Sequence, residues 1–224
     1  MVTVHLYVEG GGDSSTLRTE CRRAFSKLLR KAGCGGKMPR IVACGSRENA
    51  YDSFRTAVKS GERALLLVDS ESPVNASYME ELPSKWRPWR HLAEREGDGW
   101  EKPEGTDDAC CHLMVECMEN WLLSDSEALK AVFGKNFRED VLPEPHCVEW
   151  VSKSDAQKRL RQATVNCPGG PYGKGKHSFK ILAKLSSDSW REAVAGPNAF
   201  LISFGIPKGH YNERQGKMHG RTVR

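Results

Sequence analysis

The chain has 224 residues, which is enough to bury a sizeable hydrophobic core in one large domain or in a domain with an extension. Its 34 basic and 29 acidic side chains give a formal charge of +5, a mild excess that permits a polyanionic partner without requiring one. The eight cysteines contain no Cys-x-x-Cys pair, and no apolar run resembles a signal peptide or a membrane span, so we expect a cytoplasmic protein with reduced thiols, no structural zinc and no membrane contact.

An alternating apolar stretch over residues 2–8 predicts a first β-strand, and it runs directly into the acidic, glycine-rich turn Glu9-Gly10-Gly11-Gly12-Asp13. Glycines let the backbone approach a ligand closely, and a carboxylate in such a turn is accessible. The spacing matches neither a dinucleotide-binding fingerprint nor a P-loop. In the alternative interpretation, Asp13 only caps the next helix and Glu9 only faces solvent.

A helix is predicted over residues 14–32, with Asp13 or Ser14 as its cap and Gly33 as its stop. Its apolar stripe faces away from a basic face that consists of Arg18, Arg22, Arg23, Lys27, Arg30 and Lys31. Such a face is usually just solvated, but Arg18 and Arg22 lie directly behind the acidic turn and are candidate contacts for nucleic-acid phosphates. A second strand is predicted over 40–45 and a second helix over 46–60.

The central stretch is the apolar run over residues 64–68, which ends in Asp69-Ser70-Glu71. This pattern is typical of a buried parallel strand that delivers acidic side chains to the carboxyl edge of a sheet. The order strand-helix-strand-helix-strand predicts an α/β fold with a mostly parallel sheet flanked by helices. If the first and third strands are neighbours, Glu9, Asp13, Asp69 and Glu71 converge, and alternation along an extended chain puts Asp69 and Glu71 on one side.

Clustered carboxylates of this kind favour Mg²⁺ or Mn²⁺. The commonest use of such a site is phosphoryl-transfer or phosphodiester chemistry, in which the metal activates a water and stabilises the leaving oxygen. We therefore predict Glu9, Asp13, Asp69 and Glu71 as metal ligands, and Glu9, Asp69 and Glu71 also as catalytic residues. The residues by themselves support only an acidic metal site on an α/β sheet.

Residues 72–108 are rich in proline, tryptophan and charge, and we expect this insertion to pack over the sheet edge or to form a lid. A short strand over 111–115 precedes Glu119, a further catalytic candidate for which Glu116 could substitute. Ser124 and Glu127 predict a capping box for a helix through Phe133. We place the end of the α/β domain, residues 2–134, at this point.

Residues 135–205 are predicted to form a helical, basic extension, in which Ser154 and Gln157 cap one helix. A glycine-rich basic loop over 167–177 then leads into a helix over 178–185. Cations at a helix N-terminus can hold phosphate, so Lys174, Lys176 and His177 are candidate nucleic-acid contacts; a solvated linker is the alternative. Residues 206–224 are predicted to be a flexible basic tail.

The acidic turn after the first strand and the Leu66-Leu67-Val68-Asp69-Ser70-Glu71 run together resemble the Toprim fold shared by topoisomerases, primases and the overcoming-lysogenization-defect nucleases. The chain is more closely similar to a Toprim-like family classed as a domain of unknown function. Members of that family are often encoded beside an AAA-type or ABC-type ATPase in bacterial defence operons. The similarity covers about residues 2–185 and also rests on motifs within 112–125 and 172–182.

The resemblance implies Mg²⁺-dependent phosphodiester chemistry, with Glu9 as general acid/base or ligand and with Asp69 and Glu71 as metal ligands. Many Toprim proteins carry Asp-x-Asp at the second motif, whereas this chain has Glu71 as the second acid. That departure leaves strand passage, nicking or full cleavage undecided. The absence of a tyrosine-bearing partner domain argues against a topoisomerase, and the absence of a zinc-binding or polymerase module argues against a primase.

We therefore expect a metal-dependent nuclease that acts on DNA or structured RNA in anti-phage defence, under the control of a partner ATPase and with self-association as an open option. Two other classes of function remain as alternatives. One is a non-catalytic subunit that binds nucleic acid or the ATPase, and the other is a small-molecule phosphohydrolase or nucleotidyltransferase.

Overall fold

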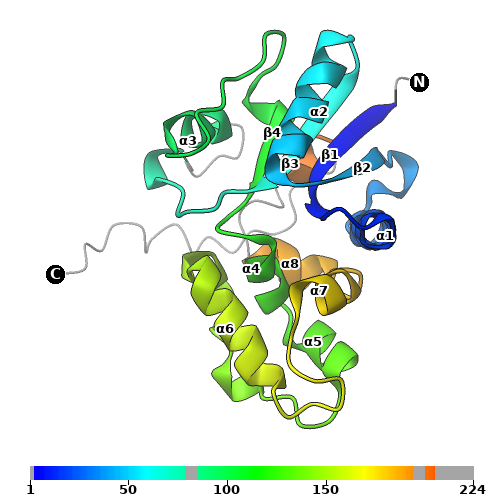
Figure 1. The fold of residues 1–224 in the computed structure, drawn as a ribbon, viewed down its shortest axis with the longest axis vertical. Helices are drawn as coiled ribbons and strands as arrows, with labels where there is room; N and C mark the ends of the chain where they lie inside the picture. Colours follow the sequence, from blue (N-terminus) through cyan, green and yellow to red (C-terminus); the bar gives the residue numbers. More distant parts are fainter. Residues whose placement is uncertain (1–2, 79–84, 194–199, 205–224) are drawn as a thin grey trace, which may run out of the picture.

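The computed structural model describes residues 3–78, 85–193 and 200–204, and residues 206–224, the predicted tail, lie outside this range. Its centre is a four-stranded, all-parallel sheet in the order β2-β1-β3-β4 (Figure 1). The strands are β1 (Val4–Gly11), β2 (Arg40–Gly45), β3 (Arg63–Asp69) and β4 (Cys111–Met114). The predicted α/β fold is confirmed. The predicted neighbours are paired as well, because β1 lies beside β3 with Val8 opposite Leu67.

Two long helices follow the first two strands, α1 (Ser15–Lys31) after β1 and α2 (Arg47–Lys59) after β2. Each begins at a serine whose hydroxyl accepts a hydrogen bond from a free N–H of the first turn: Ser14 from Leu17 and Ser46 from Asn49. Ser14, and not Asp13, is therefore the cap of α1. Both helices lie within a residue or two of the predicted ranges.

Successive residues of the inner strands point into two separate cores, as the period of two requires. Leu6 and Leu67 belong to the core that α1 covers, whereas Tyr7 and Leu66 belong to the core that α2 covers. Both faces of the sheet are thus buried, which explains why β3 is apolar at every position between Arg63 and Asp69.

The insertion after β3 packs against the α2 side of the sheet. It contains α3 (Pro88–Glu94), which lies beside β4 (Figure 1), and Trp89 is buried in the α2 core. Trp100 stacks on Tyr51 of α2 with ring centroids 4.4 Å apart and planes 5° from parallel. These rings stabilise the insertion as packing groups. Residues 79–84 of the insertion are not among the described residues.

The C-terminal half is helical, as predicted, and faces the carboxyl ends of the strands (Figure 1). Its helices are α4 (Met118–Leu123), α5 (Ser126–Phe133), α6 (Lys153–Thr164), α7 (Lys174–Leu182) and α8 (Ser187–Ala193). Short 3₁₀ helices lie at Cys34–Gly36, Ala76–Tyr78, Asp108–Cys110, Glu139–Val141 and Pro145–Trp150. Residues of this half share one hydrophobic core with α1, and Trp121 contacts Trp190 within it. No helix in the described part of the chain is both long and apolar enough to cross a bilayer.

Three local predictions in this half are wrong. Asp125, not Ser124, caps α5, because the Ser124 hydroxyl donates to the carbonyl of Trp121 at the end of α4. Ser152, not Ser154, caps α6 by accepting a hydrogen bond from the N–H of Asp155. The third wrong prediction is the start of α7, which lies at Lys174 and not at residue 178. The basic residues that were predicted in a loop therefore lie in the first turn of this helix.

Candidate metal centre

Three carboxylates meet at the carboxyl edge of the sheet. Glu9, Asp69 and Glu71 each offer one oxygen, and these oxygens all lie within 4.8 Å of one another. They converge because β1 and β3 are adjacent and parallel, so that both strands end at the same edge. This arrangement could hold a metal ion. The fourth predicted ligand, Asp13, is fully exposed and lies 3.9 Å from Arg18, outside the triad.

Glu71 reaches the triad by a turn and not by strand alternation. The strand β3 ends at Asp69, and Glu71 has a left-handed backbone with φ of 62°. Its N–H donates to the carbonyl of Glu116, which is itself left-handed with φ of 58°. Non-glycine residues with positive φ are uncommon and concentrate at functional sites. The expected alternation of Asp69 and Glu71 along an extended chain is therefore wrong, although the two carboxylates do meet.

Asp69 is the buried member of the triad, with only 2% of its surface exposed. Its Oδ1 accepts a hydrogen bond from the N–H of Met118 (2.8 Å), and its own N–H donates to Oε2 of Glu9 (3.0 Å). Burial, with the adjacent Glu9 carboxylate, holds the pKa of Asp69 well above its ordinary value. Burial also raises the pKa of Glu9, although the hydrogen bond from Asp69 and the charges of Lys174 and Arg47 oppose that shift.

Lys174, the first residue of α7, places its ammonium group between two of the acids. Its Nζ lies 3.6 Å from Oε2 of Glu119 and 3.9 Å from Oδ2 of Asp69. Burial acts to lower the pKa of Lys174, but the charges of Glu119, Asp69 and Glu9 together outweigh it and raise that pKa. Because 48% of its side chain is exposed, Lys174 faces both the acids and solvent.

Glu119 lies beside the triad without belonging to it. The residue is fully buried at the start of α4, and its Oε1 accepts a hydrogen bond from the hydroxyl of Tyr172 (3.2 Å). Its Oε2 has no hydrogen-bond partner among the described residues and only the 3.6 Å approach of Lys174. Glu116, the predicted substitute, instead accepts a hydrogen bond from the N–H of Lys153.

Two basic residues that the sequence patterns did not single out contact the triad. Arg47 donates from Nε to the carbonyl of Asp69 (2.9 Å), lies 3.8 Å from Glu9 and forms an ion pair with Asp98. Lys153 contacts both carboxylate oxygens of Glu71. Arg47 could have been found, since it lies two residues after the end of β2 at the same sheet edge. Lys153 carries no comparable local signal.

The other predicted nucleic-acid contacts are dispersed. Arg18 donates to the carbonyl of Gly12, and the exposed Arg22 donates to the hydroxyl of Thr19. Lys176 donates to the carbonyl of Gly169.

His177 is buried in the core of the C-terminal half. Its Nδ1 accepts a hydrogen bond from the N–H of Gly173, and its ring lies against Phe133 and Tyr172. Burial, with Lys176 and Lys180 nearby, lowers the pKa of His177. Its contacts are those of a packed, neutral imidazole, so of the predicted cluster of three only Lys174 reaches the acids.

The donor set fits a hard divalent cation such as Mg²⁺ or Mn²⁺. All three donors are carboxylate oxygens, which these ions prefer. Burying several acids together raises the pKa values of Asp69 and Glu9, and a bound cation would relieve that cost. The unpartnered Oε2 of the buried Glu119 adds a further oxygen without a hydrogen-bond donor beside the same site.

The fold and this site define an α/β protein with an acidic triad at the carboxyl edge of a parallel sheet. The family model for Domain of unknown function (DUF4276) matches residues 8–201, so the chain belongs to this family. The resemblance to a domain of unknown function is confirmed over most of the chain. No curated protein and no solved structure matches the chain significantly.

Proposed function

We propose that the protein is a metal-dependent nuclease that hydrolyses phosphodiester bonds in DNA or structured RNA. The observation that carries this proposal is the convergence of Glu9, Asp69 and Glu71 within 4.8 Å at the carboxyl edge of the sheet. The half-exposed Lys174 beside the acids supports a phosphate substrate, since it can pair with a phosphate that approaches from solvent. The Toprim resemblance of the two acidic motifs supports the same chemistry.

Mg²⁺ or Mn²⁺ bound by Glu9, Asp69 and Glu71 would supply Lewis acidity and an activated water. The side chains of this protein have separate tasks around it. Lys174, whose raised pKa keeps it charged at neutral pH, binds a non-bridging oxygen of the phosphate. Glu9 has one of two tasks: it binds the cation, or, where the cation is held by the other two acids, it takes up the proton of the attacking water. Arg47 holds the end of β3 in place through the carbonyl of Asp69.

We further propose, from the resemblance alone, that the nuclease serves anti-phage defence together with an AAA-type or ABC-type ATPase. Such a partner would explain a nuclease that is silent until it is released. The test is to repeat the cleavage assay described below in the presence of ATP and of an ATPase encoded beside this protein.

The test of the nuclease is incubation of purified protein with plasmid, single-stranded DNA and transfer RNA in Mg²⁺, Mn²⁺ or chelator. Asp69→Asn is the test variant, because the amide oxygen can still accept the hydrogen bond from Met118 while the negative charge is lost. Asp52→Asn, at an exposed carboxylate on α2, is the matched control. We expect metal-dependent cleavage to fall by at least about 100-fold in Asp69→Asn and to persist in Asp52→Asn. Equal cleavage by Asp69→Asn and the parent would refute the site.

One observation favours the second candidate, a non-catalytic binding subunit: the Lys153 ammonium already neutralises one of the three acids. A pure binder would hold nucleic acid in chelator as well as in Mg²⁺ and would never shorten it. The same assay, read by gel shift and by fragment length, separates the two functions.

A further inference from the structure

A basic groove lies between α1, α5 and α7. It is a cavity of about 450 Å³ with the ring of Phe179 in its wall. Its cations are Arg23 and Lys27 of α1, Lys180 of α7 and Lys184 just beyond α7, and its acid is Glu20. All four cations are exposed, and none forms an ion pair with another described residue.

The groove lies further along α1 and α7 than the metal centre, and its wall residue Phe179 lies beside Gly10, the residue after Glu9. The two helices run in the same direction. Near their N-termini Leu17 lies against Gly175, and near their C-termini Lys31 donates to the carbonyls of Ala183 and Leu185. The start of α1 follows the turn after Glu9, and the start of α7 is Lys174. At 1.5 Å per helical residue, Lys180 and Lys184 lie roughly 9 and 15 Å from Lys174 along this line.

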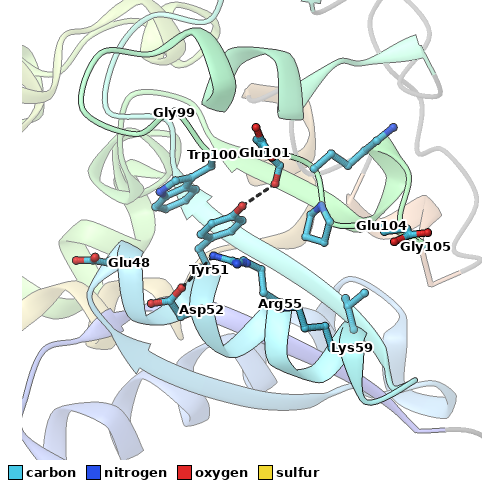
Figure 2. Close-up of a pocket in the computed structure, with 13 residues that line it drawn as sticks. Glu48, Tyr51, Asp52, Arg55, Lys59, Gly99, Trp100, Glu101, Glu104 and Gly105 are labelled. Carbon is cyan, nitrogen blue, oxygen red and sulfur yellow. Dashed lines mark hydrogen bonds and ion pairs between the residues drawn. The ribbon is translucent and has the colours of Figure 1, made fainter.

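The hollow on the opposite side of the sheet does not share this character (Figure 2). It lies over α2, and four acids, Glu48, Asp52, Glu101 and Glu104, outnumber its three cations. Its Arg55 is paired with Asp52, and its two aromatic rings, Tyr51 and Trp100, stack on each other. Of these two hollows of the described structure, the groove beside α1 and α7 is the one whose cations form no ion pair with a described residue.

We propose that this groove binds the sugar-phosphate backbone of a nucleic-acid strand, of which a phosphate about three to four steps further along lies at the metal centre. The proposal rests on the proposed function and adds the path of the substrate to it. Lysine and arginine side chains that neutralise phosphates release condensed counterions, so such binding is independent of sequence and weakens steeply with salt. The separation of roughly 9 to 15 Å corresponds to about three to four steps of 3.4 Å along one strand.

The experiment measures binding in chelator, so that cleavage is not needed. Fluorescein-labelled single-stranded DNA, duplex DNA and transfer RNA are titrated by anisotropy between 50 and 200 mM salt. The test variant is Lys27→Gln/Lys180→Gln, and the matched control is Lys59→Gln/Lys102→Gln, which removes the same charge from the α2 hollow. We expect the test variant to bind about tenfold more weakly at low salt. We also expect its log–log salt slope to fall by about 1.8 on duplex or about 1.4 on a single strand. The control should bind like the parent.

Three results would overturn the proposal: equal losses in the two variants, no loss in the test variant, or no binding of any of the three nucleic acids by the parent. If the test variant binds nucleic acid like the parent, an acidic protein would be the better candidate for the partner that the groove binds. Parallel cleavage assays in Mg²⁺ separate this proposal from the nuclease. If the test variant binds more weakly and the parent does not cleave, even with the ATPase and ATP present, the groove is retained and the nuclease is refuted. Cleavage by the parent with unchanged binding by the test variant would do the reverse.

Discussion

The ammonium group of Lys153 contacts both carboxylate oxygens of Glu71, at 2.5 and 2.6 Å. Lys153 is the first residue of α6, and its backbone N–H donates to Oε2 of Glu116, so two left-handed acidic residues are both anchored to one helix end. This contact joins the helical half to the acidic triad. A cation that binds Glu71 must therefore compete with Lys153.

We predict that Lys153→Gln raises the affinity for Mn²⁺ by about tenfold, which corresponds to about 1.4 kcal/mol. The substitution removes a competing positive charge from a largely buried carboxylate, whose side chain is 20% exposed. Calorimetric titration with Mn²⁺ measures the effect. Lys158→Gln, an exposed lysine on the same helix, controls for the change in net charge and should leave the affinity unchanged. A weaker affinity in Lys153→Gln would show that Lys153 supports the site instead of competing for it.

Arg47→Lys should lower the free energy of unfolding by about 2 kcal/mol. The planar guanidinium contacts the carbonyl of Asp69 and the carboxylate of Asp98 and lies 4.5 Å from the ring of Trp100, and one ammonium group cannot replace all three contacts. The side chain of Asp98 is 5% exposed and, among the described residues, would keep Arg95 alone as an ion-pair partner. Urea unfolding measures the change.

The matched control for Arg47 is Arg55→Lys. Arg55 also lies over an aromatic ring, that of Tyr51, but it is 44% exposed and its ion pair with Asp52 is at the surface. Its substitution should change stability by no more than about 0.5 kcal/mol. Equal losses at the two positions would mean that the contacts of Arg47 with Asp69 and Asp98 contribute little.

Gly11→Ala should destabilise the protein by about 3 kcal/mol. Gly11 has φ of +88°, and a Cβ added there would lie 2.7 Å from the Cα of Arg18, a backbone atom that cannot move aside without shifting α1. Gly12→Ala is the control, since its φ of +49° is tolerable and nothing lies within 4 Å of the added Cβ. It should cost only about 1 kcal/mol. Thermal unfolding of the two variants measures the difference, and we expect the lower midpoint for Gly11→Ala. Similar midpoints would contradict the predicted crowding at Gly11.

His112 of β4 should make stability fall in acid. Burial disfavours the charged imidazolium and so lowers the pKa of His112 to about 4 in the folded protein. In the unfolded chain the same side chain titrates near 6.5. Below pH 6.5 the unfolded state binds a proton that the folded state does not. The stabilisation is thus complete above pH 6.5 and is lost as the pH falls toward 4, by about 3 kcal/mol in total.

The measurement is urea unfolding at several pH values for the parent and His112→Gln. The carboxylates of the candidate metal centre titrate in both proteins, so the difference between the two isolates His112. We expect the stability advantage of the parent to shrink by about 3 kcal/mol from pH 7 to pH 4. Parallel pH profiles would show that protonation of His112 is accommodated in the folded state.

Local sequence determined the strands, most helix limits and the core of the site. Apolar runs set the strands, and Ser14 and Ser46 mark the starts of α1 and α2 because a cap is a hydrogen bond between near neighbours. Glu9 and Asp69 could be predicted to meet because parallel strands end at a common edge. Caps were misassigned where several serines and acids stand close together, as at Asp125.

The tertiary structure alone decided how the charges around the triad are paired. Lys153 and Glu71 are 82 residues apart, and Arg47 and Asp98 are 51 apart, so no periodicity or spacing joins them. The packing of α6 and of the insertion against the sheet edge brings these pairs together. Lys174 and His177 are three positions apart on α7, a spacing that predicts a shared helix face, yet Lys174 reaches the acids whereas His177 packs against Phe133. Sequence patterns predict interactions between residues a few positions apart, whereas the burial of a side chain depends on which distant residues the fold places against it.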